Sequence, residues 1–186
     1  MEPLPLATAS DCLVVRAWAP DEAPALHAAV VASTEHLRPW MPWIAHEPLA
    51  VEERRAMIEG WRSEAADGGD VVYGMWAEGA VVGGCGLHRR LGPGGVEIGY
   101  WVHADHVGRG VATEASRLLT ELAFTVADIE VVEVHHDVAN AASARVPEKL
   151  GFVRVADISV PAAEPRAPAE TGRRGVWRTT RQTWRG

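Results

Sequence analysis

The stretch VEIGYWVHADHVGRGVATEASRLLTEL, residues 96–122, indicates a strand, a glycine-rich turn and a helix in direct succession. Its first residues alternate as they do in a strand. One face of this strand carries Val96, Ile98, Tyr100 and Val102, and the other carries Glu97, Gly99 and Trp101. Beyond the turn G-R-G-V-A-T, residues 108–113, apolar residues recur at helical spacing. A helix that begins on such a turn aims its first backbone N–H groups at one spot, which suits an anion such as a pyrophosphate.

Two families of phosphate-binding loop do not fit this turn. No Lys-Ser or Lys-Thr pair follows the glycines, which excludes a nucleotide-hydrolysing P-loop. The third glycine of a dinucleotide-binding turn is also missing, and the turn lies too late in the chain to open such a fold. Because a Gly-x-Gly-x-Ala turn is common between any strand and helix, the anion site depends on the segments that follow.

A second strand and helix are expected at residues 131–136 and 141–150. The segment N-A-A-S-A-R-V-P-E-K-L-G-F, residues 140–152, completes a set of three motifs with E-I-G-Y-W-V and G-R-G-V-A-T-E-A. In this order and at these separations, the motifs closely resemble the GNAT superfamily of acyl-CoA-dependent N-acyltransferases, and within it the RimJ/RimL-type branch. The resemblance covers the chain from Leu13 to Trp184.

The resemblance implies the GNAT fold, an α/β (α+β) architecture in which a mixed, mostly antiparallel central sheet of about seven strands is flanked by about four helices. Two strands of this sheet splay apart where the acyl-CoA binds. The sequence pattern predicts strands at 13–19, 71–77, 80–88, 96–102, 131–136, 152–160 and 175–184, and helices at 20–35, 51–66, 111–122 and 141–150. Glycines at 83, 84 and 86 predict a bulge or a close backbone approach.

Length and composition limit the class of protein. A chain of 186 residues with 47% hydrophobic residues fits one globular domain, residues 1–186. A formal net charge of −7 argues against nucleic acid as a partner. Cys12 and Cys85 lack metal or redox spacing, so we expect no metal and a reduced, cytoplasmic setting. We expect neither a signal peptide nor a membrane partner, because the start is not basic and no apolar run is long enough to span a bilayer.

The resemblance implies acetyl-CoA, or another short acyl-CoA, as the donor. Its pyrophosphate is expected on backbone N–H groups of the turn, namely those of Gly108, Arg109, Gly110, Val111, Ala112 and Thr113. The Arg109 side chain either pairs with a phosphate or lies in solvent. The acyl-pantetheine arm is expected between the splayed strands, where a backbone N–H near Trp101 or Val102 polarises the thioester carbonyl. Asn140 matches the family asparagine that contacts pantetheine, and it is equally suited to be a helix N-cap.

Two positions depart from the family pattern. Val107 stands where many members have Gln or Arg, which matters little if the main chain supplies most of the grip. Pro147 stands where many GNAT enzymes have a tyrosine that protonates the leaving thiolate. The RimJ/RimL-type branch also lacks this tyrosine, and Ser143 is the expected substitute. Alternatively, Ser143 only satisfies a backbone N–H at the helix start, and the thiolate leaves without a dedicated acid.

Glu97 is the candidate general base on the acceptor side. An amine attacks a thioester only when neutral, and this carboxylate shares a strand face with Trp101 near the expected thioester. Its alternative role is structural, as a partner of backbone groups or of a nearby arginine. His135 ends a strand and is expected to contact the acceptor or to act as the base instead, while its neighbour His136 faces the other side of the sheet.

The segment L-R-P-W-M-P-W, residues 37–43, places two tryptophans in an expected loop. The RimJ/RimL-type branch carries a similar segment beside its substrate groove, so Trp40 and Trp43 are expected to form a wall of the acceptor pocket. The alternative is a rigid hydrophobic plug beneath the helices.

The sequence therefore predicts an N-acyltransferase that moves an acetyl group from acetyl-CoA to a primary amine. The RimJ/RimL likeness favours the α-amine of a protein N-terminus, as in a ribosomal-protein-alanine acetyltransferase, while small-molecule amines and a succinyl donor stay open. A second class of function is a non-catalytic acyl-CoA-binding or regulatory module, which needs neither Glu97 nor Ser143. A third is a homodimer whose tryptophan-rich loop forms the subunit interface rather than a pocket.

Overall fold

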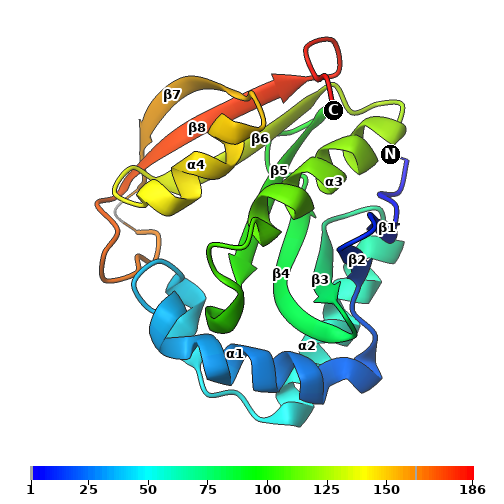
Figure 1. Ribbon diagram of the computed structural model, residues 1–186, viewed down its shortest axis with the longest axis vertical. Coiled ribbons are helices and arrows are strands. Elements are labelled where there is room, and N and C mark those ends of the chain that lie inside the picture. The colour runs from blue at the N-terminus through cyan, green and yellow to red at the C-terminus, as the bar shows by residue number, and fades with distance from the viewer. Residues whose placement is uncertain (1, 162) are drawn as a thin grey trace.

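The computed structural model describes residues 2–161 and 163–186. Within them, eight strands form one sheet in the order β1-β2-β3-β4-β5-β6-β8-β7, with four α-helices (Figure 1). The strands are β1 (Ala7–Ala9), β2 (Val14–Ala17), β3 (Val71–Ala77), β4 (Ala80–His88), β5 (Gly95–Val102), β6 (Val131–Asp137), β7 (Val153–Ser159) and β8 (Arg173–Thr180). The helices are α1 (Ala23–Leu37), α2 (Val51–Ala66), α3 (Val111–Thr125) and α4 (Ala141–Lys149). Neighbouring strands are antiparallel except β5 and β6, so the expected fold class is confirmed.

Some boundaries differ from the sequence prediction. β1 is an additional strand, because its three residues Ala-Thr-Ala carry no apolar alternation and form a strand only by pairing with β2. β8 ends at Thr180 and not at residue 184, because the Arg181 guanidinium donates to three backbone carbonyls at and after the end of α3 and the chain turns there. Residues 42–46 form a 3-10 helix where a loop was expected. No helix within the described residues has the length and apolar character needed to cross a membrane.

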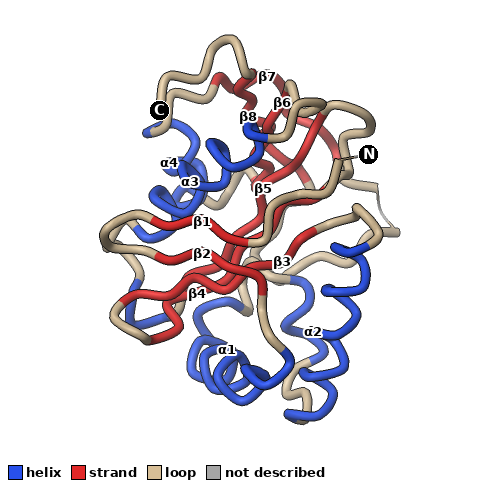
Figure 2. The backbone as a smooth tube through the Cα atoms, turned by 90° about the vertical axis from the view of Figure 1, so that its right-hand side faces the viewer, coloured by secondary structure: helices blue, strands red, loops and turns tan. Residues whose placement is uncertain are grey.

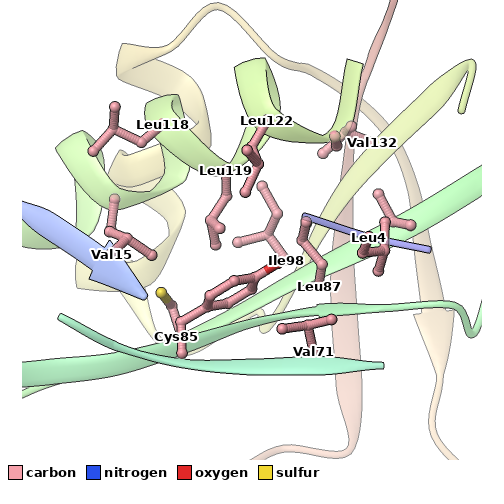
Figure 3. Close-up of a cluster of buried hydrophobic side chains, with 14 of the residues drawn as sticks. Leu4, Val15, Val71, Cys85, Leu87, Ile98, Leu118, Leu119, Leu122 and Val132 are labelled. Atoms are coloured by element: carbon pink, nitrogen blue, oxygen red, sulfur yellow. The ribbon is translucent and has the colours of Figure 1, made fainter. Parts of the chain in front are cut away.

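The predicted faces of β5 are confirmed. Val96 and Ile98 are buried on the face that α3 covers, and Tyr100 and Val102 pack against the same core. Figure 3 shows this core, with three leucines of α3 above Ile98 and its neighbours: Leu118, Leu119 and Leu122. Trp101 packs into a second core beneath α1 and α2. Helices therefore cover both faces of the sheet (Figure 2).

The parallel pairing of β5 and β6 runs from Gly95 with Val131 to Ile98 with Val134. Beyond this last pair, β5 continues to Val102 beside β4, whereas β6 continues to Asp137 beside β8. The two strands thus part within the sheet, as the resemblance implied. We call the place after Ile98 and Val134 the parting point.

The glycines of β4 have the consequences that the sequence predicted. A Cβ atom at Gly84 would lie 2.6 Å from Nε1 of Trp101, so glycine leaves room for this indole. The pairing of β3 with β4 also shifts register between Met75 and Trp76, opposite Gly83. Gly84 therefore lets the Trp101 indole lie close to β4.

Candidate active site

A cavity of about 320 Å³ lies beside the parting point. Its walls are the end of β5, the turn before α3, the start of α4 and the end of α1. The donor residues expected from the sequence that line it are Trp101, Val102, Gly108, Gly110, Val111, Ala112, Thr113, Asn140 and Ser143. Arg109 is exposed and is not among the described lining residues. The fold therefore gathers two segments that are distant in sequence, residues 108–113 and 140–143, around one space.

Two glycines shape the turn at residues 108–113. Gly108 and Gly110 have φ angles of +73° and +81°, in the left-handed region that glycine adopts without strain. Gly110 is the N-cap of α3, and its carbonyl accepts the first hydrogen bond of that helix, at 2.9 Å. The N–H groups of residues 111–113 therefore have no helical carbonyl one turn earlier. The start of α3 presents these donors, with the positive end of the helix dipole, to the cavity.

Asn140 and Ser143 lie at the start of α4. Asn140 is the N-cap, and its Oδ1 accepts a hydrogen bond from the Ser143 N–H at 3.1 Å. The capping role that the sequence left open is therefore present, and Asn140 lines the cavity as well. Ser143 Oγ lies 2.9 Å from the Tyr100 hydroxyl, which also donates to the Ser143 carbonyl at 3.1 Å.

Tyr100 is a cavity residue that sequence reasoning missed. The strand pattern assigns it only to an apolar face, yet its hydroxyl reaches α4. Burial raises the pKa of Tyr100 to about 12, so the phenol keeps its proton at neutral pH. The only signal in the sequence was Pro147, which leaves the usual tyrosine position empty without showing which other residue supplies a hydroxyl.

Glu97 and His135 lie on the sheet face that Trp101 shares, opposite Tyr100 and Val102, and they are not among the described lining residues of the cavity. Glu97 Oε2 is 3.6 Å from His135 Nδ1, and Glu97 Oε1 is 3.7 Å from Arg90 Nη1. His135 Nε2 is 2.6 Å from Glu133 Oε2, and Glu133 Oε1 accepts from Arg178 Nε at 2.7 Å. We call these five residues the charged row. The sequence pointed to Glu97 and His135 and missed the other three, which come from a turn and two further positions in the sheet.

His88 forms a second histidine–carboxylate pair on the same face. Its Nδ1 lies 2.6 Å from Asp70 Oδ2. The ring covers two glycines, because a Cβ atom at Gly86 or Gly99 would lie 2.6 Å or 3.3 Å from His88 Nε2. His88 therefore occupies the sheet surface next to the charged row.

His136 faces the other side of the sheet, as the strand alternation predicts. Its Nε2 accepts a hydrogen bond from Trp177 Nε1 at 2.8 Å, and its Nδ1 lies 2.8 Å from the Asp137 carbonyl. Both ring nitrogens are therefore engaged, and the role of His136 is structural.

A family model described as an acetyltransferase (GNAT) domain matches residues 13–153. The chain belongs to the GNAT acetyltransferase family. It is therefore an acyl-CoA-dependent N-acetyltransferase. The resemblance to the GNAT superfamily seen in the three sequence motifs is confirmed.

Relatives of this GNAT enzyme include ribosomal-protein acetyltransferases. It is 28% identical over 147 residues to YdaF of Bacillus subtilis (strain 168), a candidate ribosomal N-acetyltransferase, and the match covers 76% of this chain and 78% of YdaF. A structure of RimL, the ribosomal L7/L12 α-N-protein acetyltransferase, in complex with coenzyme A has a TM-score of 0.81 at 20% identity and covers 96% of this chain and 98% of RimL. RimJ of Mycobacterium smegmatis, in complex with a CoA disulfide, has a TM-score of 0.81 at 22% identity, with 97% and 87% covered. These structures share the fold.

The two tryptophans of the loop before α2 have different surroundings in this GNAT fold. Trp40 lines the cavity. Trp43 packs edge-on against Trp101, with ring centroids 6.3 Å apart, in the core beneath α1 and α2. A buried ion pair fixes the end of this loop, because Arg54 Nη2 donates to both carboxylate oxygens of Glu47 at 2.7 Å. Trp40 therefore suits a pocket wall, whereas Trp43 suits a hydrophobic plug.

Asp137, at the end of β6, ties together the segments around the start of α4. Its carboxylate accepts hydrogen bonds from the backbone N–H groups of residues 139, 171 and 172. Burial alone would raise the pKa of Asp137, but these hydrogen bonds outweigh burial and hold its pKa below the usual range. The same segment before β8 bonds the Trp40 loop, where Ala169 N donates to Pro39 O at 3.0 Å. Asp137 thus positions the turn that leads to Asn140.

Proposed function

We propose that this enzyme transfers an acetyl group from acetyl-CoA to the α-amine of a protein N-terminus. The observation that carries the proposal is the parting of β5 and β6 after Ile98 and Val134. It sets the N–H donors of α3 beside one face of the sheet and Glu97 with His135 on the other. A thioester between the strands is then open to an amine from the opposite face. The names of YdaF and RimL support a protein amine as the acceptor.

In the proposed donor site, the CoA pyrophosphate binds the N–H groups of residues 111–113. Gly108 and Gly110 keep side chains away from the phosphates. Arg145 and Lys149 of α4 also line the cavity, and they add positive charge near these phosphates. Arg109 lies at the outer side of the turn, where it pairs with a phosphate only at the rim.

The open edge of β5 supports the place of the pantetheine arm. His103 N donates to the Val82 carbonyl of β4 at 2.9 Å, and backbone N–H directions alternate along an antiparallel strand. The N–H of Val102 therefore points away from β4 into the opening, whereas that of Trp101 points toward β4. Of the two donors expected from the sequence, Val102 is the one we assign to the thioester carbonyl as the oxyanion donor.

The proposed reaction removes two protons from the acceptor. An ammonium first loses one proton to the pair Glu97 and His135. The neutral nitrogen then attacks the thioester carbon, the C–S bond breaks, and the second proton passes to the CoA sulfur through Ser143 and its neighbour Tyr100. An ordinary α-ammonium has a pKa of about 7.7–8.0 and a lysine ammonium about 10.4, so a carboxylate and an imidazole suit the α-amine better.

We also propose a cellular location and an oligomeric state for this enzyme. The proposal places residues 1–186 as one domain in the cytoplasm, in line with ribosomal proteins as acceptors. It includes a homodimer, for which the edge strand β7 leaves apolar side chains exposed: Val153, Val155 and Ile158. The inward packing of Trp43 argues against the tryptophan-rich loop as the subunit interface. Sedimentation at enzyme concentrations tests the dimer, and a monomer would remove it from the proposal.

CoA thiol release from acetyl-CoA, measured with a panel of N-terminal peptides and small amines, tests the proposed function. Turnover on peptides is the expected result. Turnover on small amines alone would show that the acceptor is a small molecule and not a protein N-terminus. A preference for succinyl-CoA would show that the donor is not acetyl-CoA. Thermal stabilisation by acetyl-CoA without turnover on any amine would instead support a non-catalytic acyl-CoA-binding module.

A further inference from the structure

The charged row contains Glu97 and His135, and the proposed function does not say which of the two takes the proton from the acceptor. We infer that Nδ1 of His135 is the atom that takes the first proton from the acceptor, and that Glu133 and Arg178 are positioning residues that hold the ring for this task. The inference rests on the proposed acetyl transfer and deepens it.

The partners of Glu133 determine which ring nitrogen carries the hydrogen. Glu133 is a side chain only 5% exposed, and Arg178 donates to its Oε1. As the carboxylate partner of a guanidinium, Glu133 accepts hydrogen bonds and donates none. The 2.6 Å contact of Glu133 Oε2 with His135 Nε2 therefore requires a hydrogen on Nε2. In the neutral ring, Nδ1 then keeps its lone pair.

The free nitrogen faces the other acceptor atom of the site. His135 Nδ1 and Glu97 Oε2 are 3.6 Å apart, which is longer than a hydrogen bond. One amine nitrogen placed between them can donate to both atoms. The two side chains are 13% and 15% exposed, so the site is open to a small group yet mostly withdrawn from water. The register places them at the parting point, because His135 directly follows the last paired residue of β6, Val134.

The chemistry of the two acceptors divides their roles. An ordinary carboxyl group of glutamic acid has a pKa of about 4.3 and an ordinary imidazole about 6.5. The pKa of an α-ammonium is therefore closer to that of an imidazole than to that of a carboxyl group, so proton transfer to the imidazole is less unfavourable. The proton leaves the acceptor nitrogen for Nδ1, the ring becomes an imidazolium, and Glu133 stabilises its charge through the Nε2 hydrogen. Glu97 holds the amine by a hydrogen bond, and solvent later takes the proton from the ring.

Several charged or titratable groups face His135 and enter its pH dependence. Glu97 from β5 and Glu133 from β6 bring carboxylates to its ring, and Arg178 from β8 pairs with Glu133. Arg90, in the turn before β5, lies on the far side of Glu97. His88, which bonds Asp70, lies on β4 opposite Glu97 in the strand register, and it serves as the control histidine in the experiment.

Nitrogen NMR of the ¹⁵N-histidine-labelled wild-type protein tests the ring arrangement without any acceptor. The expected result is a His135 ring in the Nε2–H tautomer above its titration, and loss of this preference in Glu133→Gln. A His135 ring in the Nδ1–H tautomer in the wild type would overturn the inference, because Nδ1 could not then take a proton.

The pH dependence of acetyl transfer tests the role in the reaction. For the wild type, kcat/KM is expected to fall as pH decreases, because His135 becomes protonated. His135→Gln is expected to lower kcat/KM at neutral pH about 100-fold and to remove this acid limb. Glu133→Gln is expected to cost about tenfold and to shift the limb to lower pH, since the imidazolium loses its counter-charge. Added imidazole is expected to restore part of the rate to His135→Ala.

Matched variants separate this role from a structural one. His88→Gln removes a histidine that also bonds a carboxylate on the same face, and it is expected to leave the limb in place. The inference is wrong if the wild type transfers acetyl groups and His135→Gln keeps both rate and limb, or if His88→Gln removes the limb instead. A wild type that turns over no amine contradicts the proposed function itself, and the tautomer measured by NMR still decides the arrangement of the ring. Acetyl-CoA affinity, measured by calorimetry, is expected to be unchanged in these variants.

Discussion

The two sides of the sheet at the parting point are built in different ways. On the α3 side, the proposed anion-binding groups are backbone N–H groups at the start of α3, and a short glycine-rich turn in one segment shapes them. On the opposite side, the charged row draws its side chains from a turn and from three strands, β5, β6 and β8. The proposed donor side therefore depends on backbone conformation, whereas the proposed acceptor side depends on the register of distant strands. Substitutions on the two sides should accordingly affect different steps.

The largest expected effect is on the cavity side. Gly110→Glu forces a side chain into a left-handed conformation and puts a negative charge at the anion site. Acetyl-CoA binding, measured by calorimetry, is expected to weaken more than about 100-fold, which is equivalent to more than about 2.7 kcal/mol. Gly151→Glu is the matched control, because Gly151 also has a positive φ, +74°, with open space around it and lies outside the described cavity lining. Equal acetyl-CoA affinity in Gly110→Glu and wild type would show that the pyrophosphate does not bind at this turn.

Glu97→Gln should separate the two sides. It removes a carboxylate that faces the acceptor and leaves the cavity lining unchanged. Turnover is expected to fall about 100-fold, while acetyl-CoA affinity is kept. If the rate is the same as that of the wild type across pH 6–9, Glu97 is a structural carboxylate and the proposed acceptor site is wrong.

Tyr100→Phe should have a smaller effect that is confined to the leaving group. The variant keeps the buried ring but removes the hydroxyl beside Ser143, so kcat is expected to fall about tenfold with little change in affinity. Tyr73→Phe is the control, because Tyr73 is also buried but its hydroxyl donates to the Pro5 carbonyl. If both variants retain full turnover, the thiolate leaves without a proton from this pair.

The last expected effect is on stability and leaves the proposed reaction steps untouched. Because the folded-state pKa of Asp137 is depressed, its ionised form stabilises the fold above the unfolded-state pKa, about 3.9, and this contribution is lost as pH falls through the folded-state value. Asp137→Asn is expected to cost about 1–3 kcal/mol in urea unfolding at pH 7 and to flatten the loss of stability below pH 4. Asp157→Asn, at an exposed pair with Arg154, is expected to cost less than about 1 kcal/mol. Equal losses of unfolding free energy in the two variants would show that the hydrogen bonds of Asp137 stabilise the fold no more than an exposed ion pair does.

The sequence predicted the cavity lining better than the members of the charged row, for a physical reason. The alternation of residues 96–102 and the glycines before α3 are local patterns, and local patterns determine backbone conformation. The contacts of Glu133 with Arg178, and of Tyr100 with Ser143, join residues 45 and 43 positions apart. Such contacts depend on strand order and register, which single motifs do not encode. The ends of β8 and the strand β1 escaped prediction for the same reason, because side-chain and pairing contacts set them.

The central claim is that an acetyl-CoA in the cavity meets an α-amine from the opposite face of the sheet. Mass spectrometry of a peptide that carries both a free N-terminus and an internal lysine, after incubation with acetyl-CoA and the enzyme, tests this claim most directly. The account predicts one acetyl group, located on the α-amine, with turnover reduced about 100-fold in Glu97→Gln and His135→Gln. Acetylation of the lysine side chain in place of the α-amine, or transfer that both variants retain in full, would contradict it.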